Sequence, residues 1–141
     1  MRVVCSATYT AHTEPLLKAC NVIKVNHIYE TKMLMFYHKL LHNTLPSYFY
    51  DFMPSYSTGN TRYPFREPRF QLPIHSHEHV KHTCRYQLPT LINTHMQSDN
   101  SQTNIEEIIN FSDMLRNAKI TPVSTFKKFV KAHYLSWYSY D

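Results

Sequence analysis

The feature of this sequence that most limits its fold is the near absence of glycine. The 141 residues include eight prolines but one glycine, Gly59. Loops that hold phosphate groups need several glycines, because the backbone must approach the ligand closely and adopt positive φ angles. Tight turns between short strands depend on glycine as well. The composition therefore argues against a glycine-rich nucleotide-binding loop and against a turn-rich β-sandwich.

The spacing of apolar residues in the first third of the chain predicts helices. Hydrophobic residues make up 43% of the sequence, which is enough for one domain with its own core. One helix is expected to begin at Thr13, because a proline two residues later is tolerated in a first turn. A second should begin after Asn26 and end before Leu45-Pro46. A short helical turn follows, with Phe49 and Phe52 packed inward.

The chain divides into three segments that together form one domain. Residues 1–53 are expected to be helical, and residues 54–97 to be extended and rich in proline, arginine and histidine. Residues 98–141 are again expected to be helical. Within the middle segment, β-like runs at Phe70–Ile74 and Thr83–Leu88 allow a short hairpin. The predicted fold class is therefore mainly α: a small helical domain with a long proline-rich central loop and room for one β-hairpin.

The final segment has the clearest amphipathic pattern. Apolar residues at 105, 108–109 and 114–115 predict one helix, and a last helix is expected to begin at Thr121-Pro122 or at Ser124. The apolar side of the last helix is formed by Phe126, Phe129, Val130 and Tyr134. Its other side carries Lys127, Lys128 and Lys131. The pattern is typical of a basic amphipathic helix.

Charge and cysteine usage limit the compartment and the partners. A net charge of +5 suits nucleic acid or another anionic partner, and equally an ordinary basic surface. The three cysteines, Cys5, Cys20 and Cys84, form no C-x-x-C pair, which disfavours a zinc ribbon or a thioredoxin-type motif. We expect reduced thiols in the cytoplasm or the nucleus, and no secretion. No stretch approaches the roughly 20 apolar residues of a membrane span, so no membrane contact is expected.

The acidic residues argue against catalysis. The aspartates, Asp51, Asp99, Asp113 and Asp141, are never adjacent, so the carboxylate pair that holds two metal ions in a polymerase is absent from the sequence. A serine-hydrolase elbow needs two glycines around its serine, and the chain has one in total. We therefore predict no catalytic residue, no cofactor and no small-molecule substrate.

A run of histidines gives weak candidates for metal ligands. On a strand, alternate residues share a face, and imidazoles placed in this way can hold zinc or copper. Prolines flank the run, however, and no second ligand pair follows at zinc-finger spacing. A histidine-rich surface is the simpler interpretation, and a Cys/His enzyme is the least favoured alternative. The candidate ligands are His75, His77, His79, His82 and Cys84.

Basic residues interleaved with aromatic ones give candidates for nucleic-acid contact. Guanidinium and ammonium groups neutralise phosphates, and exposed aromatic rings stack on unpaired bases. The same pattern also covers helical cores, so its specificity is small. The candidates are Arg62, Arg66, Arg69 and Arg85 in the middle segment and Lys127, Lys128 and Lys131 in the last helix.

The order of short motifs along the chain resembles the C-terminal tail of non-LTR (LINE-type) retrotransposon reverse transcriptases, especially of jockey-like elements. The match runs from about Arg2 to Leu135, and each motif alone is weak. Where the family usually has Gly and Trp, this chain has Leu88 and Ile92. The matching motifs are His12-Thr13-Glu14-Pro15-Leu16-Leu17, Phe36-Tyr37-His38-Lys39, His42-Asn43-Thr44-Leu45-Pro46, Asn60-Thr61-Arg62, the block from Arg85 to Asn93, and Ser124-Thr125-Phe126-Lys127-Lys128-Phe129.

The resemblance implies a non-catalytic tail fragment of an RNA-directed DNA polymerase. Such a tail would pack on the polymerase domain of the parent protein and contact RNA or DNA. Two other interpretations fit the same residues: a stand-alone basic module that binds nucleic acid or protein, and a transposon relic without function. The sequence does not separate these alternatives.

Overall fold

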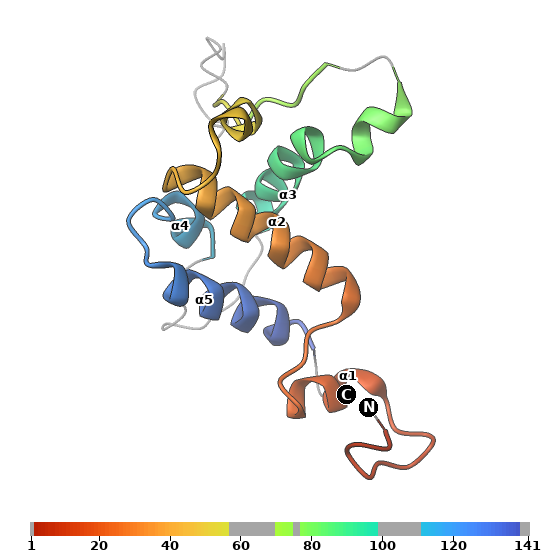
Figure 1. The fold of residues 1–141 in the computed structure, drawn as a ribbon. Helices are drawn as coiled ribbons and strands as arrows, with labels where there is room; N and C mark the ends of the chain where they lie inside the picture. Colours follow the sequence, from red (N-terminus) through yellow and green to blue (C-terminus); the bar gives the residue numbers. More distant parts are fainter. Residues whose placement is uncertain (1, 57–69, 75–76, 99–110, 139–141) are drawn as a thin grey trace.

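The structure is a computed structural model that describes residues 2–56, 70–74, 77–98 and 111–138 (Figure 1). Within these ranges the chain is mainly helical, as predicted, and contains no strand; one isolated antiparallel bridge joins Tyr56 and Phe70. The α-helices are α1 (Thr13–Ala19), α2 (Val25–Leu41), α3 (Cys84–Ser98), α4 (Phe111–Arg116) and α5 (Val123–Ser136). Two 3-10 helices are η1 (Ser47–Phe52) and η2 (Glu78–His82).

The core lies where α2 meets α3 and α5. The helix α2 contacts both of them, and α4 contacts α3 and α5 (Figure 1). Each of the four helices contributes side chains that are buried, and Phe70 joins them from outside the helices. Burial of this apolar surface is the main stabilising term of the fold. The core residues are Met33, Leu34, Tyr37, Leu40, Phe70, Leu88, Ile92, Met96, Phe111, Met114, Leu115, Ala118, Phe126, Val130 and Tyr134.

The segment predicted to be a β-like run at Thr83–Leu88 is instead the beginning of α3. The prediction was wrong because Pro89 lies inside this helix, where proline normally costs about 3 kcal/mol. Leu88, Ile92 and Met96 recur at intervals of four residues and are buried on one side of α3. Each buried side chain of this size contributes about 1.5–3 kcal/mol, so their sum exceeds the cost of the proline.

The predicted hairpin is therefore absent from the described residues, and so is the extended conformation expected for residues 84–97. Leu88 and Ile92, the two positions at which this chain departs from the retrotransposon pattern, are both fully buried. The proline-rich stretch 57–69 lies outside the described residues. The helix predicted from residue 105 onward lies partly outside them too. Its residues 105–110 are not described, and α4 (Phe111–Arg116) is the part that is.

The first two helices end through asparagine rather than glycine. Asn21 and Asn43 both have φ of 53°, a left-handed conformation that asparagine tolerates better than most residues. After α2, the amide of Asn43 donates to Leu40 and that of Thr44 to Lys39. This pair of bonds is the Schellman motif. The same pair follows α1, so at both helix ends asparagine takes the positive φ angle that glycine commonly supplies.

Other predictions for the helices were close. The predicted start at Thr13 is confirmed, whereas α2 begins at Val25 with Lys24 as its cap rather than after Asn26. The turn η1 places Phe49 and Phe52 against Phe36, with ring centroids 5.6 and 6.5 Å apart. No helix within the described ranges is long and apolar enough to cross a membrane.

Candidate functional site

The last helix, α5, presents the predicted basic face. Phe126, Val130 and Tyr134 are fully buried against α2, which fixes the rotation of α5 about its axis. Lys127 and Lys128 consequently point to solvent, and Lys131 is half-buried. Lys131 lies four residues after Lys127 and three after Lys128, so its side chain neighbours both of theirs on the helix surface, while Lys127 and Lys128 themselves point in different directions. None of the ion pairs between described residues includes Lys127, Lys128 or Lys131.

Of the other candidates for nucleic-acid contact, Arg85 alone lies among the described residues, and it belongs to α3 rather than to α5. Arg85 is exposed in the first turn of α3 and lines a hollow of about 200 Å³ with Asp51, Pro54 and Gln71. Arg62, Arg66 and Arg69 lie outside the described residues. The structure therefore brings together Lys127, Lys128 and Lys131, and leaves Arg85 as a separate charge.

The described part of the histidine run, residues 77–84, does not form the strand that a metal site on it would need. His79 and His82 belong to the 3-10 helix η2, which His77 precedes, and all three are exposed. Cys84 turns toward the core, where its Sγ lies 3.8 Å from the Sδ of Met33. Burial raises the pKa of the Cys84 thiol, which disfavours the thiolate that a metal requires. His75 lies outside the described residues, and among those described no three His, Cys, Asp or Glu side chains are placed to hold a metal ion.

Sequence reasoning missed the histidines that lie inside the fold. The ring of His27 is stacked on Tyr134 and Tyr138, with centroids 4.7 and 5.7 Å apart. His95 is buried, and its Nε2 lies 3.2 Å from the hydroxyl of Tyr134. The only available signal was the position of His95, three residues after Ile92 on the buried side of α3. Such spacing does not distinguish a core histidine from a surface one until the neighbouring helices are known.

The buried Tyr134 joins acidic and imidazole groups without forming a reactive centre. Burial, followed by a hydrogen bond with the Glu30 carboxylate, raises the pKa of Tyr134 far above its ordinary value. Its hydroxyl therefore stays protonated between Glu30 and His95. Because Tyr134 is 0% exposed, no substrate reaches this hydroxyl. The arrangement stabilises the contact of α2, α3 and α5 through hydrogen bonds rather than supplying an acid or a base.

A second pair of histidines connects α2 to the loop before α5. His38 and His42 lie one turn apart on α2, with ring centroids 4.2 Å apart. The Nε2 of His38 donates to the carbonyl of Thr121 at 2.7 Å, and that of His42 to Ala118 at 3.1 Å. Burial lowers the pKa of His38, and the nearby His42 lowers it further. The hydrogen bond to Thr121 raises the pKa, but the net effect is a lower value. Both histidines therefore serve to position α5.

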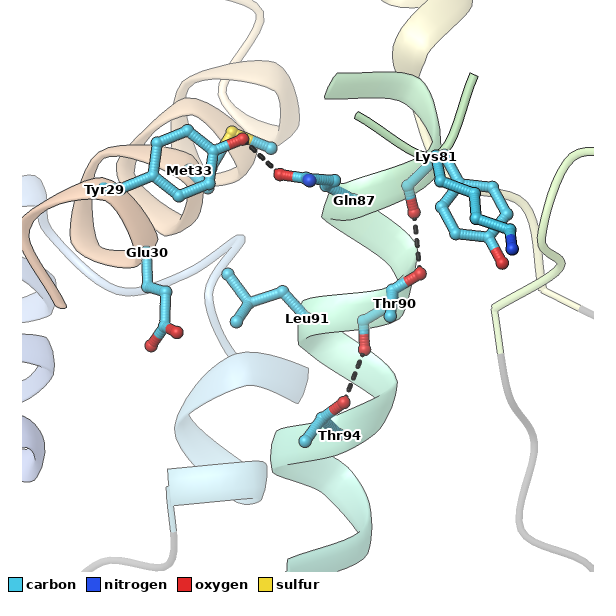
Figure 2. Close-up of a pocket in the computed structure, with 9 residues that line it drawn as sticks. Tyr29, Glu30, Met33, Lys81, Gln87, Thr90, Leu91 and Thr94 are labelled. Atoms are coloured by element: carbon cyan, nitrogen blue, oxygen red, sulfur yellow. Dashed lines mark hydrogen bonds between the residues drawn. The ribbon is translucent and has the colours of Figure 1, made fainter. Parts of the chain in front are cut away.

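A groove of about 440 Å³ runs between α2 and α3 (Figure 2). Tyr29, Glu30 and Met33 line it from α2, and Leu91 projects toward them from α3 (Figure 2). The hydroxyl of Tyr29 donates a hydrogen bond across the groove to the side-chain carbonyl of Gln87. The groove contains one carboxylate and no serine or cysteine nucleophile among its lining residues. Its mixed lining suits binding of a side chain or a ring more than a chemical reaction.

An apolar stripe on the first turns of α2 continues from this groove to the surface. Val25, Ile28 and Tyr29 are 80%, 41% and 51% exposed, and they lie on one side of the helix. Three large apolar side chains together on an exposed helix face are typical of a protein contact.

No family model, curated protein or solved structure matches this chain.

Proposed function

We propose that this chain is a non-catalytic accessory domain that binds nucleic acid through the basic face of α5, in the manner of the C-terminal tail of a retrotransposon reverse transcriptase. The observation that carries the proposal is the separation of charges on α5, where buried Phe126 and Val130 force Lys127 and Lys128 into solvent. The order of motifs that resembles such tails supports the parentage. The absence of adjacent aspartates supports the lack of catalysis.

The lysines of α5 would contact phosphates, because ammonium groups gain affinity for nucleic acid by releasing condensed counterions. The contact would be independent of base sequence, since phosphates carry no sequence information. Two exposed lysines on α2, Lys32 and Lys39, supply a comparison of equal charge on a different helix. If α5 forms the interface, the position of the lysines matters and not only the net charge.

The experiment measures the affinity for single-stranded RNA as a function of salt concentration. The variant K127Q/K128Q should bind more weakly and reduce the slope of log affinity against log salt by about 1.4, because each lost phosphate contact contributes about 0.7. The matched variant K32Q/K39Q should keep the wild-type slope. Equal losses in the two variants, or an affinity that salt does not change, would contradict the proposal.

A protein contact of the same domain is favoured by the apolar stripe Val25, Ile28 and Tyr29. In the intact parent protein this stripe would pack on the polymerase domain, with the groove between α2 and α3 receiving a side chain from it. The variant I28E should abolish co-purification with the polymerase domain encoded upstream, whereas I120E, at a position 80% exposed outside the stripe, should not. Co-purification that I28E leaves intact would remove this contact and favour the stand-alone module.

The parentage has its own test. A reading frame immediately upstream of Met1 that encodes a polymerase domain with paired aspartates would support the retrotransposon origin. An upstream region without such a frame would favour an independent module. A chain that neither binds RNA nor is expressed would favour the relic.

A further inference from the structure

Two of the three cysteines lie in contact. The Sγ atoms of Cys5 and Cys20 are 2.8 Å apart, although 15 positions separate them in the sequence. Both residues are half-buried, so small reagents reach them from solvent. A disulfide bond has a sulfur–sulfur distance of about 2.05 Å. The two sulfurs are therefore close enough to bond with a small movement of either side chain.

Local structure holds the two cysteines at this distance. Cys20 is the C-terminal cap of α1, and its amide donates to Leu16, so its backbone is fixed by the helix. Cys5 lies in a turn whose next residue, Ser6, has φ of 50°, and the amide of Ala7 donates to Arg2. The guanidinium of Arg2 donates to the carbonyl of Ala11. These bonds hold the turn that contains Cys5 near Ala11, just before α1.

We propose that Cys5 and Cys20 form a thiol–disulfide exchange site, which a low-molecular-weight disulfide such as oxidised glutathione closes into an intramolecular disulfide. One cysteine thiolate attacks a glutathione sulfur, breaks the glutathione disulfide and releases one glutathione thiolate. The other cysteine thiolate then attacks the protein-bound sulfur of the mixed disulfide and releases the second. The two protons lost by the cysteines end on two glutathione thiols, and the protein is oxidised by two electrons.

Closure of this pair acts on a part of the chain that the core does not hold. The helix α1 has no fully buried residue, and its apolar side chains Pro15, Leu16 and Leu17 are half-buried and lie outside the core cluster. A bond between Cys5 and Cys20 cross-links the segment before α1 to its end, which restricts local opening. The mutual hydrogen bond raises the pKa of the Cys5 thiol above its ordinary value, so closure should become faster as the pH rises above neutrality.

The third cysteine is a matched internal control. Cys84 is half-buried in α3 and lies against Met33 in the core, apart from the other two. In the variant C84S the proposed pair remains complete. In C5S and C20S one member of the pair is lost, and the remaining thiol can form only a mixed disulfide.

The experiment equilibrates the full chain with mixtures of reduced and oxidised glutathione, alkylates the remaining thiols and measures intact and peptide masses. Wild type and C84S should lose two hydrogens and yield one peptide pair that joins Cys5 to Cys20. C5S and C20S should instead gain one glutathione. Hydrogen exchange of the amides in residues 2–20 should slow upon closure, whereas that of α3 and α5 should not change. Two alkylatable thiols at Cys5 and Cys20 under every mixture, or a bond to Cys84, would overturn the proposal.

Discussion

Residues 2–20 and the assembly of α2, α3 and α5 are stabilised in different ways. The assembly has side chains at 0% exposure on each helix, among them Leu34, Ile92 and Val130. The helix α1 has none, and Figure 1 shows it beyond the first turn of α2, away from α3 and α4. Burial of apolar surface is worth far more than exposed polar contacts. The core and the N-terminal segment should therefore unfold with different free energies.

The connection between the two regions passes through Lys24. Its backbone amide donates to the hydroxyl of Tyr138 at 2.7 Å, and its ammonium group lies 5.2 Å from the centre of that ring. The same ammonium group pairs with Glu14 of α1. The Nδ1 of His27 is within hydrogen-bond distance of the Tyr138 hydroxyl, at 3.0 Å. Lys24 thus joins α1 to the end of α5. Four sets of substitutions test how far the two regions are independent.

The largest effect is expected from truncating the core. The variant I92A should lower the free energy of unfolding by about 2–5 kcal/mol, because it removes buried methyl groups and leaves a cavity. The variant I120A removes the same atoms at a position 80% exposed and should change stability by less than about 0.5 kcal/mol. Urea unfolding followed by the fluorescence of Trp137 measures both. Similar values for the two variants would mean that the helices are not packed as described.

The next effect separates the two asparagines that follow the C-terminal caps of α1 and α2. Alanine at a left-handed position is disfavoured by about 1–2 kcal/mol, whereas glycine is not. N43A should therefore lower global stability by about 1 kcal/mol, and N43G should preserve it. N21A should speed hydrogen exchange in α1 and leave global unfolding unchanged. Global destabilisation by N21A would show that α1 unfolds together with the core.

A smaller effect concerns pH and the core alone. Because the folded pKa of His38 is lowered, the unfolded chain binds a proton more readily than the folded one. The stability that neutral His38 provides is complete above its ordinary pKa of 6.5 and is lost as the pH falls through the lower folded value. The variant H38Q keeps a donor for Thr121 and does not titrate. Its melting temperature should fall a few degrees less than that of wild type between pH 7.5 and 5, and parallel curves would contradict this.

The smallest effect is expected at the ion pair between the regions. Glu14 and Lys24 keep 46% and 37% of their side-chain surface, so solvent screens their attraction. E14Q should speed amide hydrogen exchange in α1 at low salt concentration, and added salt should remove the difference from wild type. Global unfolding should stay the same. A large change in global stability would place α1 inside the cooperative unit.

Sequence alone was sufficient for the helices whose patterns are local. The periodicity of Phe126, Val130 and Tyr134 predicts both the existence of α5 and its buried side, because a helix repeats every 3.6 residues. The lysines of the candidate interface follow from the same pattern. The start of α1 at Thr13 also followed from local signals. These features need no knowledge of other helices.

Tertiary structure decided the features that depend on neighbours. The helix α3 contradicts its local signal, since Pro89 disfavours a helix and the partners that bury Leu88 and Ile92 are distant in the sequence. The burial of His38 and His95 likewise depends on α5. The contact of Cys5 with Cys20 depends on the turn before α1.

The near absence of glycine illustrates which features the sequence determined by itself and which the folded structure determined. The sequence by itself excluded glycine-rich loops and a turn-rich sheet, because only glycine reaches positive φ without steric cost. It did not determine that Asn21 and Asn43 take that conformation at the ends of α1 and α2. Asparagine adopts it only where the hydrogen bonds of the helix end compensate its strain. Composition thus limited the fold, and the hydrogen bonds that form at each helix end in the folded chain selected the conformation within those limits.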